Sequence, residues 1–485
     1  MASMLRMSVV NTSAGMLSML AGFICSIIVA RVLGVEGTGL VAYALWFMTV
    51  ATIVSDNGMP QAALRFINRD VTDTAPFSVL FQKLFRRFVV TTSLMAVGIL
   101  GYSLWLASQG NLNGSHVWLV TVFLFLSYAY STMGIGAAQG LGQFDRAAQM
   151  TFIGCLVQPF CVLAGALILG PVGAIVGHAI RHLPQALDLR RYVKRIPSDN
   201  QQIADDIRRY ARNNWFSGSV LALFGARIEL AIIGFFFSIS QVGYYSIGLT
   251  MTGMVAQLSL FIVAFVVPQF GALHDQADDV AFADAFEKTI RWLSIIIAPI
   301  AIGGASIAPE LIPLVFGSDF GPAVMPAIIL LVFSITHALA SVISRAILAK
   351  NRSADELRMT LVWCGITIVS LLLVVPSYGQ IGAAWVRAGA NLLLLLILGG
   401  YCIRILKLRF PLFALIKCIL AASLCAAAAI YVLSAISGAI GLLLAVSAAA
   451  LVYLAALLMF QTVPKSEIAP LVDEVKSRLK PNKPV

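Results

Sequence analysis

Apolar stretches of about 20 residues recur along the whole chain, and short polar stretches separate them. A helix needs about 20 mostly apolar residues to cross the hydrocarbon core of a bilayer. The longest polar interval between two apolar stretches, residues 189–211, is too short for an extramembrane domain. The pattern predicts fourteen membrane-spanning helices, at 8–31, 39–62, 84–107, 117–140, 149–169, 171–188, 212–236, 242–268, 287–308, 322–348, 358–376, 379–403, 411–433 and 438–460.

The composition is that of a membrane protein. Of the 485 residues, 60% are hydrophobic and only 11% are charged, whereas a soluble domain has about 45–50% apolar and about 25% charged residues. So little polar surface excludes a soluble enzyme and a disordered chain. Because the seven cysteines lie in apolar stretches without a CxxC pair, we expect no disulfide framework, no metal centre and no cofactor. The sequence predicts an all-α polytopic membrane protein.

The basic residues are concentrated on one side of the predicted membrane. The net charge is +11, from 33 Lys+Arg and 22 Asp+Glu. With the N-terminus placed in the cytoplasm, thirty of the 33 cations, Arg181 among them, fall at cytoplasmic helix ends, in loops or in the tail. This asymmetry satisfies the positive-inside rule and predicts that both termini are cytoplasmic. It also explains the net charge without nucleic acid as a partner. In the tail, residues 466–480 either form a short helix on anionic headgroups or remain in solution.

Four short motifs recur in the same order at an offset of 204 to 209 residues. One of them, Gly170-x-x-Gly173-Ala174, matches Gly379-x-x-Gly382-Ala383. Six predicted helices separate the copies, so both halves have the same orientation in the membrane. We therefore expect two parallel six-helix lobes with a substrate site between them, followed by an extra helix pair. The predicted divisions are 1–190 for the N-terminal lobe, 191–211 for a cytoplasmic linker, 212–405 for the C-terminal lobe, 406–460 for the helix pair and 461–485 for a cytoplasmic tail.

Three cations, Arg31, Arg227 and Arg387, do not fit the cytoplasmic pattern. A charge at the bilayer centre costs a few kcal/mol, so such residues usually face a wet cavity or a partner. Arg227 follows Arg212 by fifteen residues, about 22 Å along a helix, and it either lines a cavity that binds an anion or pairs with a neighbouring helix. Arg387 and His178 occupy equivalent positions in the repeat, and both are candidates to line the cavity. For His178 the alternative is an imidazole buried in the core. Arg31 either lines the cavity or extends to the outer headgroups.

Two acids are candidates for coupling transport to H⁺ or Na⁺. Asp56 precedes Gly58 and Pro60, whose ring frees a backbone carbonyl, so this stretch is a cation site, a hinge or simply a helix end. Glu229 lies two residues after Arg227, and at that spacing the two side chains point to different helix faces. The alternative drive is the membrane potential acting on an anionic load. His337 in the tenth predicted helix has no assigned role.

Three stretches resemble a known family. Leu33-Gly-Val-Glu-Gly-Thr-Gly39-Leu-Val-Ala-Tyr43 is similar to the "LLGPEGFGLYA" segment of polysaccharide flippases. Gln241-Val-Gly-Tyr-Tyr-Ser246 resembles their "EVGYYS" segment, and residues 310–323 resemble their "ILxLLFGxxYxxA" loop. Over residues 5–405 the chain thus resembles the Wzx-type lipid-linked oligosaccharide flippases of the multidrug/oligosaccharidyl-lipid/polysaccharide (MOP) exporter superfamily. The extra pair at 411–460 resembles that of its fourteen-helix members.

The resemblance implies a transporter, not an enzyme, in the bacterial inner membrane. It would move an undecaprenyl-diphosphate-linked oligosaccharide repeat unit for O-antigen, capsule or exopolysaccharide synthesis, by alternating access of two lobes around a cationic cavity. The implied partners are this lipid-linked substrate, membrane lipids, a polysaccharide polymerase and chain-length machinery.

Three alternatives remain open. A multidrug/cation antiporter of the same superfamily would need an acid-rich cavity, but the embedded acids are few beside the deep arginines. A membrane-embedded polysaccharide polymerase or acyltransferase would need a large outer loop or a catalytic cluster, and the outer residues His116, Glu310 and Asp319 are scattered. A scaffold in a polysaccharide assembly complex is the third.

Overall fold

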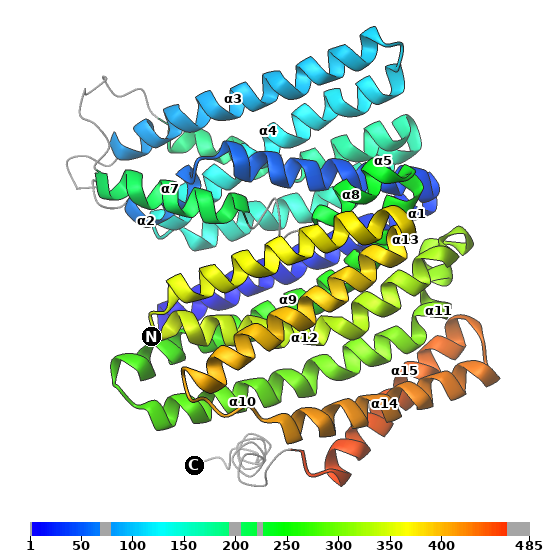
Figure 1. Cartoon of the computed structure of the whole chain (residues 1–485). Coiled ribbons are helices and arrows are strands. Elements are labelled where there is room, and N and C mark those ends of the chain that lie inside the picture. The colour runs from blue at the N-terminus through cyan, green and yellow to red at the C-terminus, as the bar shows by residue number, and fades with distance from the viewer. Residues whose placement is uncertain (1, 68–78, 194–204, 221–226, 463–485) are drawn as a thin grey trace, which may run out of the picture. The chain divides into compact units, whose positions relative to one another are not determined.

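The computed structural model describes residues 2–67, 79–193, 205–220 and 227–462, and every regular element within them is a helix (Figure 1). This confirms the predicted all-α class. The helices are α1 (Ala2–Ser55), α2 (Met59–Phe66), α3 (Val79–Ser108), α4 (Leu112–Gly140), α5 (Phe144–Ile180), α6 (Leu183–Asp188), α7 (Asp205–Val220), α8 (Ile228–Phe236), α9 (Ile239–Asp275), α10 (Asp279–Ala298), α11 (Gly304–Phe316), α12 (Val324–Ala349), α13 (Ser353–Arg404), α14 (Leu412–Ala435) and α15 (Gly438–Met459).

Three shorter helical turns complete the described chain: η2 (Leu189–Arg191), η4 (Pro299–Gly303) and η5 (Ser318–Ala323). The first continues α6, the second joins α10 to α11, and the third precedes α12. The tail helix predicted at 466–480 and residues 194–204 of the predicted linker lie outside the described residues.

Ten helices in the described part of the chain are long and apolar enough to cross a membrane. Three of them are interrupted by a glycine with non-helical backbone angles, Gly34 in α1, Gly170 in α5 and Gly379 in α13. Each of these three covers two neighbouring predicted spans for most of their length. Ten such helices support the predicted multi-pass membrane protein.

Two predicted spans are not single helices. The predicted helix at 212–236 is wrong, because α7 ends at Val220 and α8 begins only after Arg227, whose left-handed backbone (φ 62°) cannot continue a helix. The predicted span at 171–188 is also divided. There α5 ends at Ile180, and Pro184 lies in the first turn of α6, where its missing N–H costs no hydrogen bond.

Large apolar side chains on the outer face of α5 indicate contact with lipid. Phe160, Leu167 and Ile168 are 71%, 67% and 77% exposed. Gly170 divides α5 into two arms. The second arm packs against the first, on the face opposite these exposed side chains, and the two arms meet at Gly165 and Gly173. A Cβ on either glycine would collide with the carbonyl oxygen of the other, so this close approach requires glycine.

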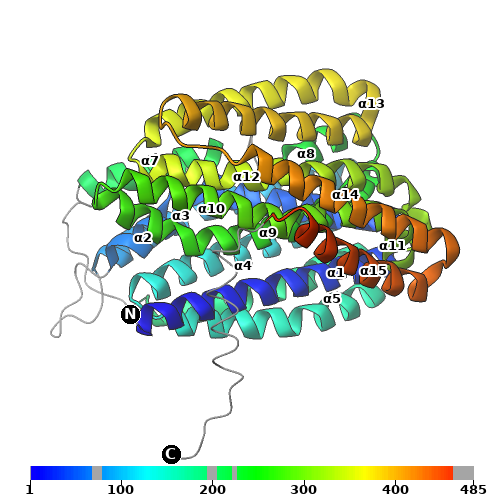
Figure 2. The same ribbon diagram turned by 90° about the horizontal axis from the view of Figure 1, so that it is seen from below.

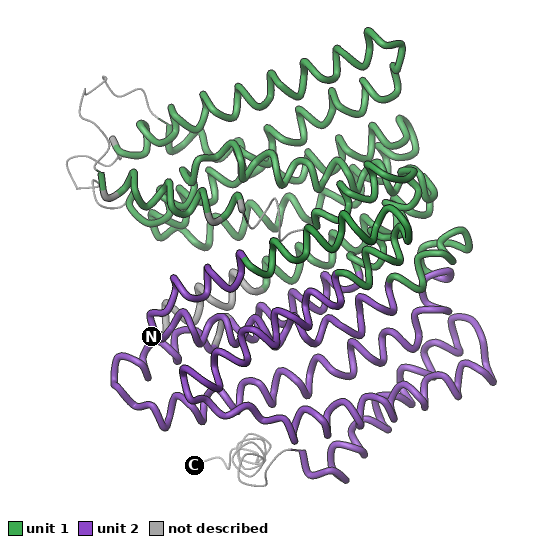
Figure 3. Tube along the Cα trace, in the orientation of Figure 1, with its two compact units in different colours: residues 1–250, 315–326, 362–386 green, residues 251–314, 327–361, 387–485 purple. Residues whose placement is uncertain are grey.

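Packing divides the chain into two compact units, unit 1 with residues 1–250, 315–326 and 362–386, and unit 2 with residues 251–314, 327–361 and 387–485 (Figure 3). In unit 1 the fully buried rings of Phe81 and Phe88 in α3 share a core with Phe125 of α4. A second core in this unit gathers Cys25 of α1 and Ile175 of α5. The lobe boundaries that the repeat predicts, 1–190 and 212–405, stay a prediction.

Unit 2 is held together by contacts between its long helices. Helices α14 and α15 run side by side, as both views show (Figures 1 and 2). The Tyr453 hydroxyl of α15 donates a hydrogen bond to the Ile295 carbonyl of α10 at 2.7 Å. The rings of Phe270 and Phe282, with centroids 5.1 Å apart, join α9 to α10. The Tyr453 hydrogen bond joins the predicted extra helix pair to the rest of unit 2.

Candidate functional site

The first candidate region is the turn at which α1 ends. Asp56 closes this turn, because its Oδ1 accepts a hydrogen bond from the Gly58 backbone N–H at 2.7 Å. Asn57 (φ 51°) and Gly58 (φ 70°) both lie in the left-handed region, and Pro60 stands in the first turn of α2. Helix α7 packs so closely here that a Cβ on Gly58 would collide with the Ala211 carbonyl oxygen. The chain direction is therefore fixed around a half-buried carboxylate.

The second candidate region is the turn between α5 and α6, which Arg181 and His182 form. Arg181 follows the helix-reversing Gly170 by eleven residues, about 16 Å at 1.5 Å per residue. It therefore lies well inside the predicted span 171–188, seven residues before its end. Gly154 in the other arm of α5 packs directly on the Arg181 carbonyl, where no Cβ fits.

Polar side chains from α4 and α5 surround this turn. The Gln158 amide Nε2 donates to His178 Nδ1 at 3.0 Å, and both side chains are buried. Because Nδ1 accepts this bond, the ring proton of a neutral His178 is on Nε2. The His182 ring packs edge-on against Tyr128, with ring centroids 4.9 Å apart.

Arg181 is the central charge of this cluster. Its guanidinium lies within electrostatic range of His178, His182 and Tyr128. Tyr128 is also within electrostatic range of the Asp56 carboxylate. Arg181 is half-buried and makes no side-chain hydrogen bond or ion pair with any described residue. A guanidinium with nearby imidazole donors suits an anionic oxygen, above all a phosphate.

Arg227 and Glu229 occupy the start of α8. Arg227 is the N-cap of this helix, and its side chain is exposed. Glu229, two residues on, is fully buried at 0% exposure. The two side chains therefore lie in different environments.

Arg387 and Arg31 lie in different surroundings. Arg387 in the second arm of α13 is half-buried and within electrostatic range of the exposed His337 of α12. Arg31 in α1 is exposed, and its Nε donates to the Val315 carbonyl at 2.9 Å. Arg31 thus has a structural contact to the end of α11, 284 positions further along the chain.

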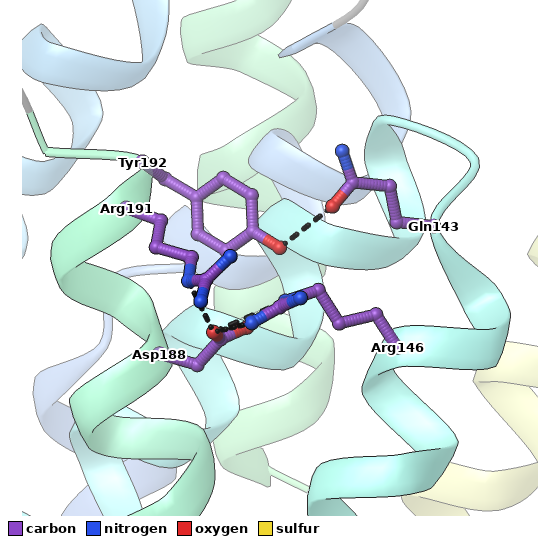
Figure 4. Close-up of polar contacts among 5 residues, drawn as sticks. All are labelled: Gln143, Arg146, Asp188, Arg191 and Tyr192. Carbon is purple, nitrogen blue, oxygen red and sulfur yellow. Dashed lines mark hydrogen bonds and ion pairs between the residues drawn. The ribbon is translucent and has the colours of Figure 1, made fainter.

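A polar network fixes the end of η2 in unit 1 (Figure 4). The Arg146 guanidinium donates two hydrogen bonds to the Asp188 carboxylate, from Nη2 to Oδ1 at 2.6 Å and from Nε to Oδ2 at 2.8 Å. Arg191 adds a 3.2 Å contact to the same carboxylate, and the Tyr192 hydroxyl donates to Gln143 Oε1 at 2.9 Å. Burial, and then the Asp188 carboxylate, raise the pKa of the Tyr192 hydroxyl above its usual value. The hydroxyl therefore stays protonated as a donor.

The structure brings together only part of the predicted set. His178 and Asp56 lie around one polar cluster, whereas Arg31 is engaged at another helix end. Arg181, His182 and Tyr128 were not predicted as site residues. The sequence feature that could have identified Arg181 is its position inside the predicted span 171–188, three residues before Pro184. Tyr128 carries no sequence signal, because only the fold brings α4 to this turn. Among the described residues, no three His, Cys, Asp or Glu side chains are grouped to hold a metal ion.

Comparison with known proteins identifies the family. Residues 28–325 match the family of polysaccharide biosynthesis proteins, and the chain belongs to this family. It is 24% identical to the probable low-salt glycan biosynthesis flippase Agl15 of Haloferax volcanii over 166 residues, or 34% of this chain. That match spans only 35% of the length of the relative.

Solved structures establish the fold. The lipid II flippase MurJ in an inward closed conformation is similar with a TM-score of 0.67 and 12% identity, over 94% of this chain and 98% of that chain. An inward-facing multidrug resistance MATE family transporter of the MOP superfamily is similar with a TM-score of 0.64 and 14% identity, over 83% of this chain and 98% of that one. The fold that the resemblance implies is confirmed.

Proposed function

We propose that the protein is a flippase for an undecaprenyl-diphosphate-linked oligosaccharide repeat unit in the bacterial inner membrane. The observation that carries the proposal is Arg181, half-buried beside two imidazoles and without an ion-pair partner among the described residues. Cations inside membrane proteins mostly face a wet path or a partner, and the natural ligand of this one is an anion. The family, and the similarity to a glycan biosynthesis flippase and a lipid II flippase, support a lipid-linked glycan as that anion.

The chemistry of the load explains why a cationic path is needed. A diphosphate sugar headgroup cannot cross hydrocarbon unaided, because each unpaired polar group costs several kcal/mol. In the proposed mechanism Arg181 and the imidazole N–H groups of His178 and His182 replace the water around the diphosphate. Tyr128 and Asp56 then serve as partners for sugar hydroxyls, while the lipid tail stays in the bilayer. Alternating access of two lobes moves the headgroup outward.

The other predicted site residues enter the proposal at later positions along the path. Arg227, exposed at the start of α8, and Arg387, half-buried in α13, are proposed to hold the headgroup as it passes. Arg31 would act at the outer end of the first arm of α1, just before Gly34. Asp56 and Glu229 are the proposed coupling acids. Glu229 is fully buried, and a buried carboxylate is costly unless a proton or a cation neutralises it.

The proposal includes a place in the cell. Both termini lie in the cytoplasm, in accordance with the positive-inside pattern. The exported unit passes to a polysaccharide polymerase and chain-length machinery for O-antigen, capsule or exopolysaccharide synthesis. These enzymes act on the product of this protein and are its proposed functional partners.

The test is deletion of the gene followed by complementation and analysis of lipid-linked oligosaccharides. Deletion should cause cytoplasm-facing lipid-linked oligosaccharide to accumulate, and the natural chain should reverse this. Arg181→Gln removes a charge-assisted contact that is typically worth about 1.5–3 kcal/mol, so flipping should fall about ten-fold or more. Arg208→Gln is the control, because Arg208 is exposed on α7 and its contact to Asp205 is long, at 3.7 Å. Full activity of folded Arg181→Gln would exclude this assignment.

A multidrug antiporter is the second candidate, and the fully buried Glu229 together with the MATE-like fold favours it. An antiporter of cationic drugs needs a buried acid and does not need Arg181. Its deletion strain would have normal lipid-linked oligosaccharide pools and increased drug sensitivity. Glu229→Gln would then abolish drug resistance, whereas Arg181→Gln would leave it intact.

A further inference from the structure

A groove of about 460 Å³ lies in unit 2, where the first arm of α13 begins and its second arm ends. One residue of the first arm and several of the second line it. Its apolar part extends along the second arm, and a phenol and a guanidinium close one end. The residues that matter here are Met359, Leu396, Ile397, Gly400, Tyr401 and Arg404. The groove is separate from the cluster around Arg181, which belongs to unit 1.

Two local features keep the groove open. A Cβ built on Gly400 would meet no atom within 4 Å, so the missing side chain leaves space in the groove wall. Tyr401 is fixed beside it, because its hydroxyl donates to Asp355 Oδ2 at 2.6 Å. The same carboxylate lies 3.8 Å from Arg352 and 3.5 Å from Arg358. Asp355 is therefore shared among Tyr401, Arg352 and Arg358, and it forms no ion pair with Arg404, which lies at the same end of the groove.

The charge at that end is positive. The Arg404 side chain is exposed and makes no hydrogen bond or ion pair with any residue that the structure describes. Lys407 and Arg409 follow it and are also exposed. Residues 352–358 and 404–409 together contain five basic and two acidic residues. The partial negative charge of the α13 C-terminus, about half an elementary charge, is smaller than this excess.

We propose that this groove binds an anionic phospholipid, with the phosphate at Arg404 and an acyl chain along Leu396 and Met359. The occupant must be both apolar and anionic, because the walls are aliphatic and the end at Arg404 is cationic. Leu396 is 63% exposed on a helix that is long and apolar enough to span the membrane, so the groove opens toward lipid. A basic residue at the membrane surface attracts an anionic headgroup. This proposal holds whether the protein is a flippase or an antiporter.

Native mass spectrometry of the purified full-length protein tests the proposal. The probes are phosphatidylglycerol and phosphatidylcholine with the same acyl chains, titrated separately. The natural chain should retain phosphatidylglycerol adducts and bind phosphatidylcholine at least five-fold more weakly. Arg404→Gln should weaken phosphatidylglycerol binding about five-fold, and Gly400→Leu should abolish it by filling the groove. Gly389→Leu, also on the second arm with no atom within 4 Å of its Cβ position, should bind normally.

Three outcomes would overturn the proposal. The first is equal retention of phosphatidylglycerol by Arg404→Gln and Gly400→Leu in protein that elutes as the natural chain does. The second is equal binding of phosphatidylcholine, which would remove the role of charge. The third is displacement of the adduct by millimolar inorganic phosphate, which would assign the cationic end to a free anion. Because the two variants act by different means, a folding defect in one leaves the other informative.

Discussion

Gly170 and Gly379 have the same non-helical backbone, with φ 60° and ψ −140° at the first and φ 54° and ψ −138° at the second. They are 209 positions apart, the offset at which the sequence repeats. His178 and Arg387 each lie eight residues beyond one of these glycines. The repeat is therefore a repeat of backbone conformation, and it gives the two side chains equivalent register positions in their helices.

Alanine at either glycine should destabilise the protein. These backbone angles lie in a region that L residues rarely adopt, at a cost of about 1–3 kcal/mol. Gly170→Ala should cost about this amount, because its Cβ would meet no atom within 4 Å. Gly379→Ala should cost more, since its Cβ would collide with the Gln241 side chain, whose Oε1 accepts from Gln380 N at 3.1 Å. Thermal unfolding midpoints in one detergent measure both.

Gly389→Ala is the matched control for this pair. Gly389 lies inside the second arm of α13 with open space around its Cβ position. Alanine there should raise stability by about 0.5–1 kcal/mol, because it restricts the unfolded chain and suits a helix. An unchanged midpoint for Gly170→Ala would show that the interruption of α5 does not depend on a glycine conformation.

Helix positions were predictable because lipid-facing helices need only length and hydrophobicity. The predicted spans 411–433 and 438–460 agree with α14 and α15 to within a few residues. Hydropathy does not report backbone conformation, so it does not predict the left-handed backbone at Arg227. Pro184 indicates the helix break at Arg181, because proline favours the first turn of a new helix. The charge pattern alone does not indicate it, since it assigns Arg181 to a cytoplasmic helix end.

The site was less predictable than the fold, since its members come from separate helices. His178 was identifiable through the repeat, because its partner position is an arginine. Its contact with Gln158 was not, although both lie in α5, because that contact requires the reversal of α5 at Gly170. Tyr128 belongs to α4, and only tertiary packing brings it to His182.

The Gln158–His178 hydrogen bond should contribute measurably to stability. Gln158→Leu leaves the Nδ1 atom of a buried imidazole without its donor, which typically costs about 1–3 kcal/mol. Among described residues, the Gln158 Oε1 atom has no hydrogen-bond partner, so the substitution removes a single bond. The double variant Gln158→Leu/His178→Phe should cost less than the sum of the two single variants. Additive effects in this double-mutant cycle would show that the two side chains are not coupled.

Asp188 should matter far more than a surface acid. Asp188→Asn should lower stability by about 1–3 kcal/mol, because Arg146 loses a two-point ionic contact to a carboxylate only 9% exposed. The control is Asp205→Asn, since Asp205 is 90% exposed and lies 3.7 Å from Arg208. That change should fall within about 0.5 kcal/mol. Similar thermal midpoints for the two variants would show that the network of Figure 4 does not hold the end of η2.

Arg227 allows its charge and its backbone to be tested separately. Its left-handed conformation costs an L residue about 1–2 kcal/mol, which glycine does not pay. Arg227→Gly should therefore be more stable than Arg227→Ala, although both lack the charge. If Arg227 holds an anionic headgroup, both variants should flip lipid-linked oligosaccharide about ten-fold more slowly than the natural chain, and Arg227→Lys should retain most activity. Reconstituted flipping measured beside thermal midpoints gives both quantities. Natural flipping rates in Arg227→Gly would exclude Arg227 from the substrate path and assign it to the start of α8 alone.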